Sequence, residues 1–331
     1  MRVSILMPRD LRDLCFSPET LKEIGSRITL RSDVPEGKLS TGWLREQIRG
    51  SDAVITGWGT PRLTPDVLDQ APGLKAIFHS AGSIKHLEFP GFWDRGIRVS
   101  SAASTNGVPV AEFLLGQILV AFKGGFHYPA RFRERGKAGW GLIPQVIGYY
   151  GTTVGIVGMG NVGKHLLRLL GAFEFRKLVH SFYPFEAQAR KAGAELVDID
   201  TLMAESDAVV VAAPNIPEYR HMFDARRFAL MRDGAWFLNA ARGALVDEAA
   251  LIAELKAGRI SACLDVTDPE PPVEGSPLYS LPNVVLTPHV AGSTGRECLR
   301  LGDQVLREID HWLNHEPFEN EITAELAPVI G

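Results

Sequence analysis

The stretch VGIVGMGNVGKHL, residues 154–166, joins a short apolar run to three glycines in the spacing G-x-G-x-x-G. The apolar run predicts a buried β-strand, and the residues after the last glycine predict a helix. Gly158 permits a tight turn, Gly160 leaves room for a phosphate beside the backbone, and Gly163 lets the helix lie close to the strand. Because helix N-termini attract anions, this strand–turn–helix unit predicts a dinucleotide site.

The position that would hold the adenosine ribose is expected about 20 residues later, where an acidic residue ends the next strand. Here the chain reads LVHSFYPFE over residues 178–186, so Tyr183 occupies the expected place and Glu186 lies three residues later. Arg176 and Lys177 precede this strand, and no arginine replaces the acid where a 2′-phosphate would need one. The sequence therefore leaves the choice between NAD and NADP open.

The composition of the 331-residue chain is that of an ordinary globular protein, with 45% hydrophobic residues, 22% charged residues and a net charge of −4. Nucleic-acid and membrane-surface partners require concentrated positive charge, so we expect neither. The chain has three cysteines, Cys15, Cys263 and Cys298. Their odd number and wide spacing indicate free thiols. No signal-peptide core or run of about 20 apolar residues is present, so we expect a cytoplasmic protein.

Strand and helix patterns alternate in two parts of the chain, which predicts two α/β domains with parallel sheets. One part is the first hundred residues, where residues 17–25 predict a helix capped by Ser17 and ended by Gly25. The other begins at Thr152. Between them, residues 108–124 predict a helix that is apolar on nearly every face and buried between domains or against a second subunit. Residues 125–150 predict an irregular loop.

Three polar residues follow strands of the second part: Arg242 in NAARGALVDE, Glu270 in LDVTDPEPP and His289 in LTPHVAGST. The carboxyl ends of parallel strands meet at one edge of a sheet, so we expect all three side chains at the crevice where a nicotinamide would lie. His289 could donate the proton that reduction of a ketone requires near neutral pH. Arg242 suits a substrate carboxylate and would lower the histidine pKa, which Glu270 would raise again.

Each of these three residues alone has an ordinary structural explanation, as a surface arginine, a turn glutamate and a loop histidine. Their joint position beside one dinucleotide-binding unit favours catalysis. A metal hydrolase is disfavoured, because no pair of the nine histidines has a helical ligand spacing with a carboxylate beside it.

The motifs VGIVGMGNVG, NAARGALVDE, DVTDPEP and TPHVAGST resemble, in order and approximate spacing, those of the D-isomer-specific 2-hydroxyacid dehydrogenases. This family includes glyoxylate/hydroxypyruvate reductases, and the resemblance covers nearly the whole chain. It implies two doubly wound parallel-sheet domains. One is a Rossmann NAD(P)-binding domain over residues 106–292, and the other is a flavodoxin-like, discontinuous substrate domain made of residues 1–105 and 293–331.

The resemblance also implies the partners and the site. The cofactor would be NAD or NADP, the substrate a small 2-oxo or 2-hydroxy acid of the D-isomer, and the assembly a homodimer with the long apolar helix at its interface. Arg242, Glu270 and His289 match the family's catalytic residues. The expected cofactor contacts are Gly158, Gly160, Asn161, Val162, Gly163, Tyr183, Pro214, Ala240 and Asp265. The expected substrate contacts are Ala81, Gly82 and Ser83, through backbone amides, and Asn106.

The substrate loop HSAGSIKH departs from the family pattern, which often has Gly-x-Gly followed by Asp. Ser80 stands at the first position, and no Asp follows among Ile84, Lys85 and His86. The identity of the substrate therefore stays open. Transcriptional corepressors also resemble this family, so a dinucleotide-sensing regulatory protein is the alternative to an enzyme.

Overall fold

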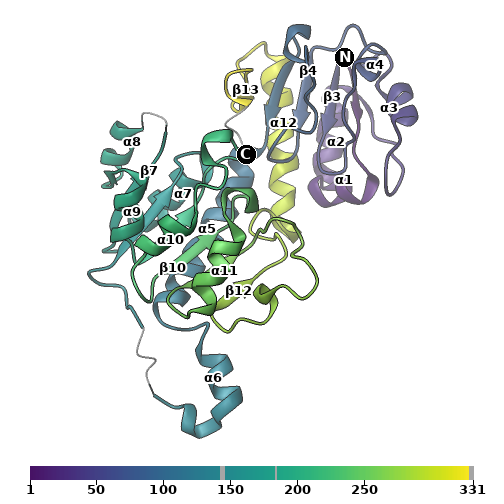
Figure 1. Cartoon of the computed structure of the whole chain (residues 1–331). Helices are drawn as coiled ribbons and strands as arrows, with labels where there is room; N and C mark the ends of the chain where they lie inside the picture. Colours follow the sequence, from purple (N-terminus) through teal and green to yellow (C-terminus); the bar gives the residue numbers. More distant parts are fainter. Residues whose placement is uncertain (142–145, 183–184, 328–331) are drawn as a thin grey trace. The chain divides into compact units, whose positions relative to one another are not determined.

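The structure is a computed structural model that describes residues 1–141, 146–182 and 185–327 (Figure 1). It divides into two compact units, one made of Met1–Gly107 and Ser293–Gly331 and the other of Val108–Gly292. Each unit is built on a predominantly parallel sheet with helices on its faces, so the predicted α/β class is confirmed.

The first unit contains a six-stranded sheet in the order β13-β5-β4-β3-β1-β2. Neighbouring strands are parallel except for β13, which pairs antiparallel with β5. The order of the five parallel strands is that of flavodoxin-like folds. The strands are β1 (Arg2–Ile5), β2 (Thr29–Arg31), β3 (Ala53–Thr56), β4 (Ala76–His79), β5 (Arg98–Ser101) and β13 (Glu321–Ile322).

The helices of the first unit include one that ends later than the sequence predicts. Ser17 caps α2 (Pro18–Arg27) by accepting a hydrogen bond from the Thr20 amide at 3.0 Å, as predicted. The helix nevertheless continues past Gly25 to Arg27, because a helical glycine costs only about 1 kcal/mol and Ile24 beside it is buried in the core. The other helices are α1 (Arg9–Cys15), α3 (Thr41–Ile48), α4 (Pro65–Leu68), α12 (Leu299–Leu313) and the 3₁₀ turns η1 (Trp93–Arg95) and η6 (Gly295–Cys298).

The second unit contains a seven-stranded parallel sheet in the order β12-β11-β10-β9-β6-β7-β8, which is the doubly wound Rossmann order with one added strand. The strands are β6 (Thr153–Val157), β7 (Arg176–His180), β8 (Glu195–Leu196), β9 (Ala208–Val211), β10 (Trp236–Asn239), β11 (Ser261–Leu264) and β12 (Val284–Leu286). The strand order reverses between β6 and β9, so a crevice for a ligand is expected at their carboxyl ends.

Two apolar clusters cover the opposite faces of this sheet. Helices α9 (Ile199–Glu205), α10 (Ala225–Leu230) and α11 (Glu248–Lys256) contribute to one cluster. Helices α5 (Ala103–Phe122), α7 (Asn161–Leu170) and α8 (Glu186–Lys191) contribute to the other. The 3₁₀ turns are η3 (Pro217–Tyr219), η4 (Gly243–Leu245) and η5 (Pro277–Tyr279).

Helix α5 begins at Ala103, five residues before the predicted start, and runs through Pro109. By length and composition it could cross a membrane, which the sequence had not indicated, and its mean hydropathy is 1.3. Half of that apolar stretch is buried inside the structure, and the core helices of globular proteins meet the same criteria.

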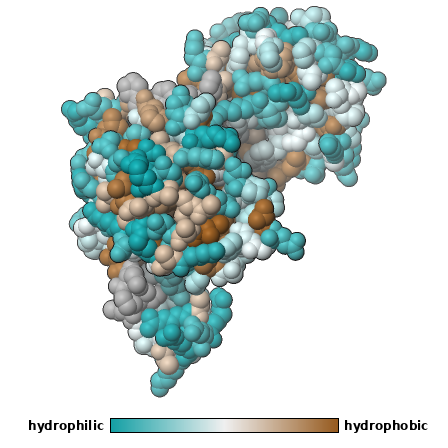
Figure 2. Space-filling model, in the orientation of Figure 1, coloured by the Kyte–Doolittle hydropathy of each residue, from teal (hydrophilic) through white to brown (hydrophobic). Residues whose placement is uncertain are grey.

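The prediction of an irregular loop over residues 125–150 is wrong in part, because α6 (Tyr128–Arg135) and the 3₁₀ turn η2 (Gly136–Gly139) form there. None of the α6 residues is buried, so the sequence lacks the apolar period that would have predicted the helix. Figure 1 shows α6 in an arm that projects from the second unit, and Figure 2 shows that this arm is mostly hydrophilic.

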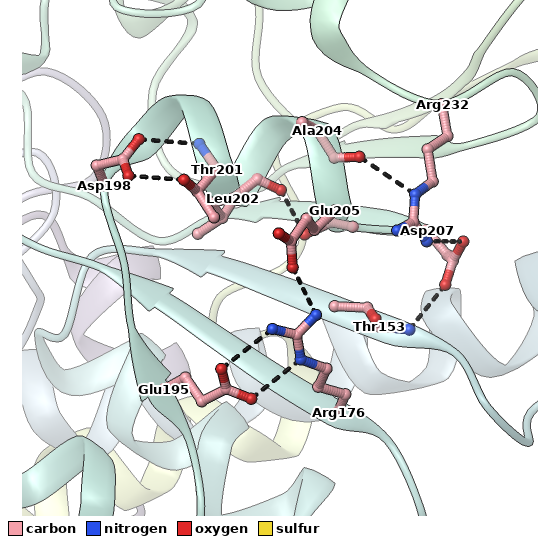
Figure 3. Close-up of polar contacts among 11 residues, drawn as sticks. Thr153, Arg176, Glu195, Asp198, Thr201, Leu202, Ala204, Glu205, Asp207 and Arg232 are labelled. Atoms are coloured by element: carbon pink, nitrogen blue, oxygen red, sulfur yellow. Dashed lines mark hydrogen bonds and ion pairs between the residues drawn. The ribbon is translucent and has the colours of Figure 1, made fainter.

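Ion pairs hold the amino-terminal end of the second sheet (Figure 3). Arg176, the first residue of β7, donates two hydrogen bonds of 3.0 Å to Glu195 of β8 and one of 2.5 Å to Glu205 of α9. Asp207, which precedes β9, accepts from the Thr153 amide at 2.7 Å. This network fixes the strands at their amino-terminal ends, opposite the carboxyl ends where the crevice is expected.

Candidate active site

The glycine turn after β6 has the shape that a dinucleotide phosphate requires. A Cβ at Gly158, whose φ is 105°, would meet the carbonyl oxygen of Ala212 at 2.5 Å, and a Cβ at Gly163 would overlap the carbonyl oxygen of Gly158. At Gly160, no atom of the described residues beyond its own chain neighbours and helix backbone lies within 4 Å of that position, so the backbone is open there. The crowding explains why residues 158 and 163 are glycines, and the open space at Gly160 leaves room for a phosphate.

The N-terminus of α7 is available to an anion. Gly160 is the N-cap of this ten-residue helix, no side chain caps it, and its first turn contains no acidic residue. The amides of this first turn, where Asn161 and Val162 lie, and the helix dipole both favour negative charge. The residues present therefore fit the phosphates of the NAD(P) cofactor that the sequence predicts.

The other predicted cofactor contacts follow strands of the same sheet. Pro214 lies after β9, Ala240 directly follows β10, and Asp265 directly follows β11. Tyr183 lies outside the described residues. Within the described part of the chain, no group of three or more His, Cys, Asp or Glu side chains is placed to hold a metal ion.

Glu270 and His289 form a hydrogen-bonded pair at the carboxyl end of the sheet. The distance from Glu270 Oε1 to His289 Nδ1 is 2.6 Å, and both side chains are about half exposed. Glu270 lies in the loop after β11, and His289 lies three residues after β12. Because this bond engages Nδ1, it leaves Nε2 as the ring nitrogen that can exchange a proton with another group.

Arg242 lies at the same edge, three residues after β10. Its guanidinium donates to the carbonyl of Ala241 at 2.6 Å. Burial lowers the pKa of Arg242 below its usual value, and the negative charge of Glu270 opposes that shift. A Cβ at Gly243 would overlap the backbone of Thr267, so the Arg242 loop lies directly against the loop that leads to Glu270. The structure thus brings the three predicted catalytic residues to one edge of one sheet.

Asp265 holds the segment that carries His289, a contact that the sequence did not reveal. Its carboxylate is buried and accepts from Thr287 Oγ1 at 2.6 Å, from the Val290 amide at 2.8 Å and from the Ala291 amide at 2.9 Å. The strand register explains the contact, because Leu264 pairs with Leu286 and the next residues, Asp265 and Thr287, therefore lie beside each other.

A cavity of about 690 Å³ adjoins the Glu270–His289 pair. Its polar wall includes Asp265, Glu270 and His289, and its apolar wall includes Leu278, Val284 and Leu286. The Glu270–His289 pair therefore borders a largely apolar hollow in the second unit.

The predicted substrate loop of the first unit follows β4. Ser101 Oγ donates to the carbonyls of Ala81 at 3.0 Å and Gly82 at 2.5 Å, which fixes the backbone before Ser83. His79, the last residue of β4, lies 2.9 Å from Thr56 Oγ1 through Nδ1. Complete burial lowers the pKa of His79 to about 3, so its imidazole is neutral.

The side-chain oxygen of Asn106 forms a hydrogen bond with another residue of the first unit. Its Oδ1 accepts a hydrogen bond from the Ser293 amide at 2.9 Å. These two residues stand next to the two points where the chain passes between the units, Gly107 and Gly292. The bond therefore ties the two crossing segments together.

Known proteins resemble this chain in sequence and in fold. Residues 116–291 match the family described as "D-isomer specific 2-hydroxyacid dehydrogenase, NAD binding domain". A D-3-phosphoglycerate dehydrogenase from Archaeoglobus fulgidus is 31% identical over 299 residues, which cover 88% of this chain and 56% of the relative. The chain thus spans little more than half the length of that relative.

Two solved structures match over nearly their whole length. The TT0316 protein from Thermus thermophilus has a TM-score of 0.75 at 29% identity, covering 98% of this chain and 100% of that one. A phosphoglycerate oxidoreductase from Rhizobium etli has a TM-score of 0.79 at 26% identity, covering 98% of both chains. The protein described here belongs to the D-isomer specific 2-hydroxyacid dehydrogenase family.

Proposed function

We propose that the protein is an NAD(P)-dependent oxidoreductase that interconverts a small 2-oxo acid and the corresponding D-2-hydroxy acid, with glyoxylate and hydroxypyruvate as the first candidate substrates. The observation that supports this best is the 2.6 Å bond between Glu270 and His289, on the same sheet edge as Arg242. When bound, the nicotinamide supplies or accepts the hydride.

His289 acts as the general acid of the reduction. A ketone that gains a hydride becomes an alkoxide, and a proton on Nε2 of the imidazolium neutralises it. The Glu270 carboxylate accepts a hydrogen bond from Nδ1 and so orients the ring with Nε2 towards the substrate. Asp265 assists by holding Val290 and Ala291 on the C-terminal side of His289.

Arg242 binds the carboxylate of the substrate. A guanidinium presents a planar fork of donors that matches a carboxylate and stays charged even when partly buried. Desolvation lowers the pKa of Arg242, because burial disfavours the charged guanidinium. A bound substrate carboxylate would offset this cost of burying the positive charge. We also propose Ala81, Gly82, Ser83 and Asn106 as substrate contacts of the first unit.

The test is a steady-state assay of the purified protein with NADH and with NADPH. The substrates are glyoxylate, hydroxypyruvate and phenylpyruvate, joined by 3-phosphohydroxypyruvate because relatives are named D-3-phosphoglycerate dehydrogenases. Turnover of at least one is expected. Nucleotide binding without turnover of any 2-oxo acid would instead support a dinucleotide-sensing regulatory protein.

We further propose that the protein acts as a cytoplasmic homodimer with α5 at the interface. The apolar Val120 on this helix is 41% exposed in the single chain, as expected for a face that a second copy covers. Light scattering after size-exclusion chromatography should give twice the mass of the 36.2 kDa chain.

A further inference from the structure

Among its described residues, the connection from β7 to α9 offers no unengaged carboxylate for the adenosine ribose. Three acidic residues lie between β7 and α9, and each already has a partner. Glu186 pairs with Arg190 at 2.6 Å, and Glu195 pairs with Arg176 at 3.0 Å. Asp198 caps α9, accepting from the Thr201 amide at 2.9 Å and from its hydroxyl at 2.6 Å.

The last residue of β7, His180, brings no negative charge to this place either. Its side chain is buried, with Nδ1 3.2 Å from the carbonyl of Val197, and burial lowers its pKa. Its Nε2 is enclosed and has no hydrogen-bond partner among the described residues. The strand therefore ends in a neutral imidazole, three residues before Tyr183, which stands at the position where the NAD type of fold has an acid.

A positive charge lies close to the same place. Lys164 directly follows Gly163 of the phosphate-binding turn, and its ammonium lies 4.9 Å from the centre of the Phe185 ring. Phe185 is the N-cap of α8, in the connection that follows β7. The exposed ammonium thus extends from the glycine turn towards the β7–α8 connection.

We infer that the adenosine side of the cofactor site accepts a 2′-phosphate, with Lys164 as its charged contact, so that the protein prefers NADP(H) to NAD(H). A carboxylate at this position would accept hydrogen bonds from the ribose and repel a 2′-phosphate, whereas an ammonium attracts the phosphate. The inference rests on the proposed dinucleotide site and adds which dinucleotide that site selects.

The test measures binding of two fragments to the whole protein by isothermal titration calorimetry. Adenosine 2′,5′-bisphosphate (2′,5′-ADP) carries the 2′-phosphate, and adenosine 5′-diphosphate (5′-ADP) lacks it, so neither measurement requires turnover. We expect 2′,5′-ADP to bind about ten-fold tighter, as a charge-assisted contact allows. The preference should shrink as salt is raised, because this contact is exposed.

Four variants assign the effect to Lys164. Lys164→Ala should lose about ten-fold in affinity for 2′,5′-ADP and leave 5′-ADP nearly unchanged, and Lys164→Arg should keep the preference. Lys191→Ala is the matched control, because it removes the same charge from an exposed position at the end of α8. Phe182→Asp places a carboxylate after β7. This variant should weaken the binding of 2′,5′-ADP more than the binding of 5′-ADP.

Equal affinity of the wild-type protein for the two fragments would overturn the inference and leave the dinucleotide site intact. Equal weakening of both fragments by Lys164→Ala would also overturn the inference, because the lysine would then contact the single 5′-phosphate that they share. If neither fragment binds, the proposed dinucleotide site is itself wrong, and the inference fails with it.

Discussion

At the scale of single residues, the proposed chemistry depends on His289. Its ring is held from Nδ1 by Glu270, and its backbone amide donates to the carbonyl of Asp265 at 3.0 Å. General acid catalysis contributes about 10² to 10⁴ in rate, so His289→Ala should lower kcat by at least about 100-fold. The dissociation constant for the nucleotide, measured by titration, should stay unchanged. A variant that loses nucleotide binding instead would give His289 a structural role.

Arg242 should act on substrate binding and on turnover together. Removing its charge with Arg242→Ala takes away the partner of the substrate carboxylate, so KM for the 2-oxo acid should rise and kcat should fall. A charge-assisted bidentate contact is worth roughly 1.5–3 kcal/mol, which corresponds to roughly 10- to 100-fold in kcat/KM. Unchanged turnover of every acid in the panel would show that Arg242 has no such role.

His79 should make the stability of the first unit depend on pH. Its pKa is 6.5 in the unfolded chain and about 3 when folded, so between these values the unfolded state binds more protons. Its contribution to stability is therefore complete above pH 6.5 and is lost as the pH falls towards 3, by up to about 1.4 kcal/mol per pH unit.

The variant His79→Asn keeps a polar atom near Thr56 Oγ1 and removes the titration. The difference in urea midpoint between pH 7.5 and pH 5 should be smaller in this variant than in the wild-type protein. An identical pH dependence in both proteins would mean that His79 does not titrate on unfolding.

At the scale of elements, Arg176 connects the start of β7 to β8 and α9. Its side chain is 45% exposed, so water and salt screen the pairs with Glu195 and Glu205. Arg176→Ala should lower the free energy of unfolding by about 1 kcal/mol or less, and the difference should disappear in 1 M NaCl. Arg190→Ala is the control, because it removes a single pair within α8 and should have a smaller effect.

The sequence predicted elements well where burial imposes a pattern, and poorly where it does not. Strands such as β6 and β9 are fully buried and read as apolar runs. Helix α6 buries none of its residues and was therefore missed. The edge on which Arg242, Glu270 and His289 meet follows from the direction of parallel strands, which the βα alternation already implies.

Contacts within loops were beyond the reach of sequence reasoning. Asp265 was expected to face the cofactor, and the structure shows its carboxylate engaged by Thr287 and two backbone amides. Asn106 was expected to face the substrate, and its Oδ1 accepts from Ser293, 187 residues away. Such contacts depend on strand register and on how distant segments meet, which residue spacing does not encode.

At the scale of the whole molecule, the nucleotide should stabilise the protein by mass action. A ligand that binds only the folded state at 100 times its dissociation constant adds about 2.7 kcal/mol to stability. NADH or NADPH should therefore raise the melting temperature in a thermal-shift assay. Gly163→Val should abolish this rise, because even a Cβ at that position overlaps Gly158. An equal rise in both proteins would place the nucleotide elsewhere.

The discontinuity of the first unit sets the order in which the parts can form on the ribosome. Residues 108–292 leave the exit tunnel as one uninterrupted stretch, whereas the first unit must wait for its last segment. That segment brings the apolar side chains of α12, including Leu301, Val305 and Ile309, into the core formed with the N-terminal strands. The strands before residue 108 are translated before the second unit, but they keep an uncovered apolar face until α12 has been synthesised, which exposes them to chaperones for longer than the second unit.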